Sequence, residues 1–143
     1  MDVVEWLIYA LLSAVTAALV AIFGKIGLEG VDSITATGVR AGIMFAAIMV
    51  LIIVTGRAGN IANLDRKSLF YIVLGGLAGA ASWVFYFFAL QYGKASQVAP
   101  IDRLSVVFVI VLAATILGEK VSLQAAVGTV LVAIGAIIIA LAG

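Results

Sequence analysis

The chain has 143 residues, of which 66% are hydrophobic and 10% are charged, with a formal net charge of +1 at pH 7. A mean hydropathy of +1.34 leaves too little polar surface for a water-soluble domain, and the small net charge argues against nucleic acid as a partner. The chain contains neither cysteine nor histidine, which excludes a thiol redox centre and a typical zinc site. The sequence therefore predicts an integral membrane protein that has no cofactor, binds no metal and contacts the lipid bilayer.

Five apolar stretches account for most of the chain, at residues 4–24, 34–54, 69–90, 98–117 and 123–141. At ~1.5 Å rise per residue, a helix of each length can cross a hydrocarbon layer ~30 Å thick. Continuously apolar segments favour helices over barrel strands, because a barrel strand alternates apolar and polar residues. The predicted fold is an all-α integral membrane protein, with a single five-transmembrane-helix domain over residues 1–143.

The first stretch lacks the positively charged region that opens a secretory signal peptide, so we interpret it as a retained transmembrane helix. The longest polar connection covers residues 57–67, and Asn63 or Asp65 is a predicted cap of the third helix. Pro100, the only proline, is expected in the first turn of the fourth helix, where a missing N–H does least harm. Ser122 is the predicted cap of the fifth helix.

Lysines and arginines outside the predicted helices are divided between the two membrane faces. One face carries Arg57, Arg66, Lys67 and Lys120, and the other carries Lys25 and Lys94. The positive-inside rule then predicts a multi-pass protein of the cell (inner or plasma) membrane with a cytoplasmic N-terminus. Because four against two is a small difference, insertion in both orientations and insertion in one orientation both stay open.

Three ionisable residues lie within predicted spans: Arg40 in the second helix, and Asp102 and Arg103 in the fourth. In the predicted topology these two helices enter from the same face, so all three residues lie ~8 to 9 Å deep. Charged groups at such depth usually face a cavity or a partner. We expect Arg40 to pair with Asp102, and Arg103 to face water or an anionic group of a substrate. The alternative is that the groups only neutralise one another or extend to the interface.

The third helix carries Ser82, Trp83 and Tyr86, which are spaced three and four residues apart and can line one face. Trp83 and Tyr86 lie deep enough that the indole N–H and the phenol O–H need partners. We predict that these three residues contact substrate, and that Trp83 attracts cationic substrates through its ring face. Ordinary packing between helices is the alternative.

Small residues recur four or seven residues apart in four of the helices. This spacing lets helix backbones approach closely, either within the chain or, for the fifth helix, between two copies. The sequence does not decide between these two uses. The residues are Ser13, Ala17 and Ala21; Gly38, Gly42 and Ala46; Gly75 and Gly79; Gly128 and Gly135.

Residues 88–105 read Phe-Ala-Leu-Gln-Tyr-Gly-Lys-Ala-Ser-Gln-Val-Ala-Pro-Ile-Asp-Arg-Leu-Ser, and residues 117–122 read Leu-Gly-Glu-Lys-Val-Ser. Together with the glycine-spaced last helix, these segments resemble the EamA-type repeat of the drug/metabolite transporter superfamily. Arg40 falls where that repeat often has an arginine. The resemblance covers the whole chain, which is similar to the short five-helix bacterial and archaeal transporters. Small multidrug-resistance exporters are less similar, since they have four helices and an acidic residue within the first.

This resemblance implies a secondary transporter of small metabolites or drugs that works by alternating access and is not an enzyme. Many relatives carry two repeats of inverted topology, so one repeat is half of such a transporter. We therefore expect a homodimer, antiparallel if the chain inserts in both orientations. The resemblance implies a small-molecule substrate, for which the candidate contacts are Arg40, Ser82, Trp83, Tyr86, Asp102 and Arg103. The alternative is a non-transporting membrane partner subunit of a related transporter.

Overall fold

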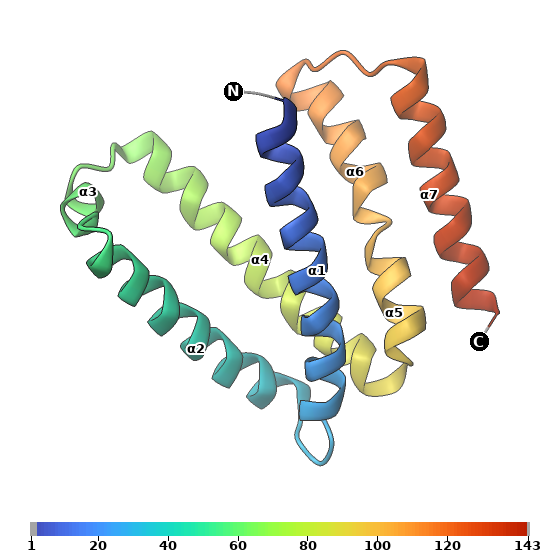
Figure 1. Cartoon of the computed structure of the whole chain (residues 1–143), viewed down its shortest axis with the longest axis horizontal. Helices are drawn as coiled ribbons and strands as arrows, with labels where there is room; N and C mark the ends of the chain where they lie inside the picture. The colour runs from blue at the N-terminus through green and yellow to red at the C-terminus, as the bar shows by residue number, and fades with distance from the viewer. Residues whose placement is uncertain (1–2, 143) are drawn as a thin grey trace. The chain divides into compact units, whose positions relative to one another are not determined.

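The computed structural model describes residues 3–142, and all regular structure in this part of the chain is helical, with no strand (Figure 1). Five segments in it are long and apolar enough to cross a membrane, which confirms the predicted all-α fold with five spans. The elements are α1 (Val3–Gly27), α2 (Ser33–Val54), α3 (Ala58–Ala62), α4 (Arg66–Tyr92), α5 (Ala95–Asp102), α6 (Ser105–Leu112), the π-helical turn η1 (Ala113–Leu117) and α7 (Leu123–Leu141).

Short polar side chains begin three of the long helices. Asp32 Oδ1 accepts the N–H groups of Ile34 and Thr35 at the start of α2, at 2.9 and 3.0 Å. Asp65 Oδ2 accepts the N–H of Ser68 at 3.1 Å, and Ser122 Oγ accepts the N–H of Ala125 at 3.1 Å, which confirms the predicted caps of α4 and α7. Each cap satisfies a backbone donor that the first helical turn leaves without a partner.

The predicted fourth helix differs most from the structure. Only Gly93 and Lys94 separate α4 from α5, so the helix starts before residue 98 and Pro100 lies inside α5. The prediction that Pro100 belongs to the first turn is therefore wrong. The span is also divided into α5, α6 and η1, whereas the uniformly apolar sequence predicted one continuous helix.

The chain forms two compact units. The first contains α1 and the chain from Tyr92 onward, and the second contains residues 27–91 with α2, α3 and α4. In the first unit, Gln97 Nε2 on α5 donates to the carbonyl oxygen of Ala140 on α7 at 3.0 Å. Lys25 Nζ at the end of α1 donates to the carbonyl oxygen of Gly93 at 2.8 Å. That residues 1–143 act as a single domain stays a prediction.

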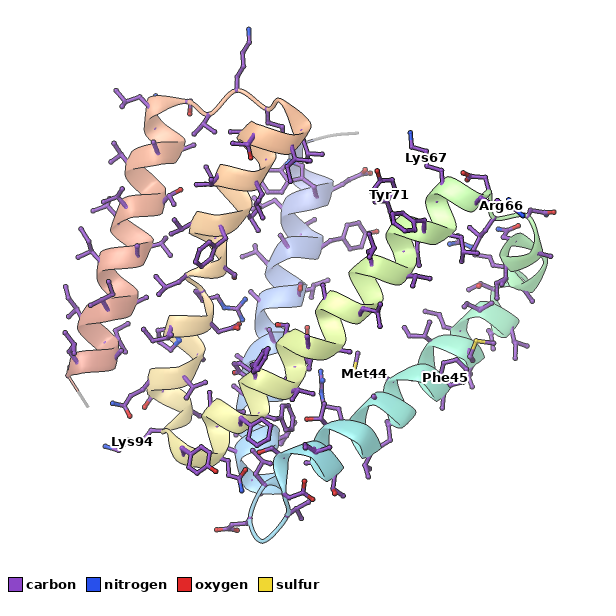
Figure 2. All side chains as sticks on the ribbon, turned by 180° about the vertical axis from the view of Figure 1, so that it is seen from behind. Met44, Phe45, Arg66, Lys67, Tyr71 and Lys94 are labelled. Carbon is purple, nitrogen blue, oxygen red and sulfur yellow. The ribbon has the colours of Figure 1, made fainter. Side chains whose placement is uncertain are left out.

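In the second unit, α2 and α4 lie closest near Ser33 and diverge toward α3 (Figure 1). Met44 and Phe45 lie midway along α2, and Tyr71 lies along α4 beyond Arg66 and Lys67 (Figure 2). Met44, Phe45 and Tyr71 are all exposed. Exposed apolar side chains at this density face lipid or another membrane helix, since water would penalise them.

Candidate functional site

A polar contact joins α2 to α4. Ser33 Oγ donates to the carbonyl oxygen of Phe87 at 3.3 Å and also forms a hydrogen bond with Gln91 Oε1. Thr37 Oγ1, one turn further along α2, donates to the carbonyl oxygen of Ser33 at 2.6 Å. Ser33, Thr37 and Phe87 are buried. Buried hydrogen bonds of this kind are shielded from water, so they hold the two helices in one register.

Arg40 lies on the same face of α2 as Ser33, about two helical turns further into the span. Its guanidinium carbon is 3.3 Å from the centroid of the Trp83 ring and 5.6 Å from that of Phe87. Trp83 and Phe87 are four residues apart, so both rings lie on the face of α4 that meets α2. The electron-rich ring face attracts the cation. The register that Ser33 sets thus brings a positive charge against an aromatic wall.

Three rings form this wall. The Trp83 and Tyr86 centroids are 5.6 Å apart with their planes at 78°, and the Trp83 and Phe87 centroids are 6.0 Å apart at 60°. Such edge-to-face contacts are favourable because the positive ring edge meets the negative face of its neighbour. Phe87, which is only 3% exposed, is absent from the predicted site residues. Its position four residues after Trp83, on the same face of the helix, is the sequence signal that could have identified it.

The fourth span is interrupted between α5 and α6. The N–H groups of Arg103 and Leu104 donate to the carbonyl oxygens of Pro100 and Ile101, at 3.1 and 2.9 Å, three residues back instead of four. Pro100 has no N–H, so the helical bond that this residue would donate is also missing. Asp102 is the last residue of α5 and Arg103 follows it. Both ionisable residues therefore lie at the interruption and not within a continuous helix.

A groove of about 560 Å³ lies next to this interruption, within the first unit. Arg103 is the one charged residue among the described residues that line it, and the others are small or aliphatic. A groove with apolar walls and one cation suits an apolar group that carries a polar or negative end. The other lining residues are Ala14, Ala17 and Ala18 of α1, Ala99 and Pro100 of α5, and Val132, Gly135, Ala136 and Ile139 of α7.

The structure brings together three of the six predicted site residues, since Arg40 contacts Trp83 and Trp83 contacts Tyr86. Ser82 is exposed on the same helix. Asp102 and Arg103 belong to the other unit, so the pairing of Arg40 with Asp102 stays a prediction. Among residues 3–142, no group of three or more acidic side chains is placed to hold a metal ion.

Comparison with known proteins matches residues 4–141 to the EamA-like transporter family. The chain belongs to this family. A Sinorhizobium protein named "Uncharacterized transporter in cobO 3'region" is 38% identical over 136 residues, which cover 95% of this chain and 96% of that protein. No solved structure matches. As an EamA-like protein with five apolar spans, the chain is a membrane transporter whose helices contact the lipid bilayer.

Proposed function

We propose that this EamA-like chain is a secondary transporter of small metabolites or drugs in the cell membrane, and that it acts as a homodimer by alternating access. The observation that carries the proposal is Arg40, half-buried against the Trp83 ring within a membrane span. An ionisable group at such a place is costly for membrane insertion and marks a substrate pathway by default. The proposed substrate contacts are Arg40, Ser82, Trp83, Tyr86, Asp102 and Arg103.

Two observations support a homodimer. The Sinorhizobium relative is called a transporter and has nearly the same length, which supports a transporter assembled from chains of this size. A Cβ atom added at Gly42, Gly79, Gly128 or Gly135 would meet open space. Small-residue faces of this kind let helices of two copies approach closely. Alternating access needs two halves that move around a site, and a second copy supplies the second half.

The proposal is tested by reconstituting the purified chain in proteoliposomes and screening uptake of amino acids, organic cations and nucleoside-like metabolites. Trp83→Ala is expected to lower transport more than membrane insertion, because it removes the wall that holds Arg40. Trp6→Ala is the matched control, since Trp6 is 54% exposed on α1. Absence of flux for every class, or full flux in Trp83→Ala, contradicts the proposal.

An antiparallel dimer requires the chain to insert in both orientations. Because the chain has no cysteine, an introduced cysteine is a unique label. In intact cells, a maleimide that does not cross membranes is expected to label roughly half of the chains at Asn60→Cys and roughly half at Glu29→Cys. The same labelling in permeabilised cells gives the total number of reactive chains. Labelling of all chains at one position and none at the other contradicts the antiparallel arrangement and leaves a parallel dimer.

A further inference from the structure

We infer that Arg40, stacked on Trp83, is the receptor for the anionic group of the transported molecule, and that this molecule is a small organic monocarboxylate. The inference rests on the proposed function, because it assigns the substrate class of that transporter. It is carried by the geometry of the guanidinium, its position in the span, and the balance of charge at the site.

The short distance between Arg40 and Trp83 fixes how the guanidinium lies. Its carbon is 3.3 Å from the ring centroid, and its C–N bonds are about 1.3 Å long. If the group stood upright, one or two nitrogens would lie only about 2.0 to 2.6 Å from the ring plane, which is closer than van der Waals contact allows. The guanidinium therefore lies nearly flat on the indole. Its N–H donors project from the edge of the group, where the ring does not cover them.

This arrangement prepares a site for an anion. A flat guanidinium offers pairs of parallel N–H donors that match the two oxygens of a carboxylate. Stacking on Trp83, with Phe87 nearby, restricts the side chain before any ligand arrives, so less freedom is lost on binding. Arg40 lies ~10 Å from the start of α2, where the low dielectric strengthens attraction between opposite charges. Trp83 is thus a positioning residue for Arg40.

The same contact argues against a cationic substrate. Arg40 already covers the face of Trp83 that was predicted to attract a cationic substrate, and its charge repels a second cation. One arginine balances one negative charge. A phosphate dianion would leave one negative charge without compensation in a region that strongly disfavours it.

Intrinsic fluorescence of Trp83 gives a direct test, because the chain has two tryptophans and Trp6→Phe leaves Trp83 as the sole reporter. The full-length Trp6→Phe protein in nanodiscs is titrated with carboxylates from acetate to octanoate. Butylammonium, butanol and butyl phosphate serve as probes of the same chain length with a different head group. We expect a saturable change with at least one carboxylate and none with the other three.

Variants at Arg40 separate binding from folding. Arg40→Gln is expected to weaken carboxylate binding at least tenfold, since hydrogen bonds to a charged group are lost. Arg40→Lys keeps the charge without the planar fork and is expected to bind with intermediate affinity. Arg57→Gln is the matched control, because Arg57 belongs to the same unit but lies outside the spans. Circular dichroism of each variant verifies that the helices are retained.

Three results overturn the inference: a saturable response to butylammonium or butyl phosphate, no response to any carboxylate, or unchanged carboxylate binding in folded Arg40→Gln. Each of these leaves the transporter proposal intact if the proteoliposome screen shows flux of another substrate class. Conversely, carboxylate binding that depends on Arg40, without flux of that carboxylate or of any screened class in proteoliposomes, contradicts transport and leaves the binding site standing. The two proposals therefore fail separately.

Discussion

Two arginines within membrane spans of this transporter have contrasting surroundings. Arg40 lies on the ring of Trp83 and near that of Phe87, on helices that Ser33 holds in register. Arg103 is exposed at a helix interruption, and it lines a groove otherwise formed by small and aliphatic residues such as Ala17. The same residue type is thus fixed by aromatic rings in one unit and left on an open apolar surface in the other.

The difference shows that the neighbouring helix determines what an arginine in a span can do. An arginine held on a ring has already lost much of its rotamer freedom, so a ligand binds it at lower entropic cost. An arginine in a groove of small side chains keeps that freedom and has space beside it for an apolar body. We therefore expect Arg40 to determine which head group binds, and Arg103 to respond more to the shape of the molecule.

The largest expected effect concerns the ion pair between Arg40 and Asp102 that the sequence predicts. Removing one member of a buried ion pair can destabilise a protein by ~3 to 5 kcal/mol, less where water reaches the site. Arg40→Ala, Asp102→Ala and the double variant are therefore expected to be non-additive in unfolding free energy, measured in mixed detergent micelles. Strict additivity would show that Arg40 and Asp102 are not coupled.

Next in size is the effect of removing the Ser33 hydrogen bonds, which hold α2 and α4 in register. Ser33→Ala removes the hydroxyl that bonds both the Phe87 carbonyl and Gln91 Oε1 across the two helices, a loss of about 1 to 3 kcal/mol. Thr16→Ala is the control, because Thr16 Oγ1 bonds only within α1, at 3.0 Å to the Leu12 carbonyl, and is expected to change stability by less than about 0.5 kcal/mol. Equal losses in the two variants would show that Ser33 does not set the register.

A smaller effect is expected from the stacking itself. A double-mutant cycle between Arg40 and Trp83 should give a coupling of about 0.5 to 2 kcal/mol, the usual range for a cation on an aromatic face. The same cycle between Arg57 and Trp83 should give no coupling, since Arg57 precedes α3 at the far end of α2. A coupling as large for Arg57 as for Arg40 would attribute the effect to general charge and not to the ring.

The fold was predictable because the bilayer restricts the choice of structure. Long apolar segments specify helices when no water is present to satisfy the backbone, and the caps at Asp65 and Ser122 follow from local chemistry. The interruption after Asp102 was not predicted. Apolar residues continue on both sides of the interruption, so hydropathy does not reveal it. Pro100 would have indicated it only if the start of the helix had been placed at Ala95, which puts the proline inside the helix.

The candidate site was predictable only in part. Arg40, Trp83 and Tyr86 were identified because polar and charged groups are rare in a span. That Arg40 contacts Trp83 was not predicted, since it depends on how α2 and α4 are aligned, and Ser33 and Gln91 set that alignment over a separation of more than fifty residues. The groove beside Arg103 was missed for a similar reason, because its alanines and glycine carry no chemical signal of their own.

The smallest expected effect depends on pH, at the start of the helix that carries Arg40. Hydrogen bonds from the side chain and the N–H of Thr35, together with the N–H of Ile34, hold the pKa of Asp32 below its usual value of 3.8. The folded protein therefore favours the ionised carboxylate. The contribution of Asp32 to stability is fully present above about pH 4 and is lost as the pH falls through the lowered pKa.

Asp32→Asn isolates this contribution, because asparagine caps a helix but does not titrate. As the pH falls below about 4, we expect the unfolding midpoint of the unmodified protein to fall slightly more than that of Asp32→Asn. Above about pH 5 we expect the midpoints of the two proteins to change with pH in parallel. Asp65→Asn is the matched variant at the start of α4, where hydrogen bonds from Ser68 lower the pKa of Asp65 in the same way. Because a carboxylate ligand is itself protonated below about pH 4, binding is compared as affinity for the ionised ligand. If only the cap of α2 is linked to Arg40, acid should lower this affinity in the unmodified protein and in Asp65→Asn but less in Asp32→Asn. Identical pH profiles of binding in all three proteins would show that the start of α2 does not hold Arg40 in place.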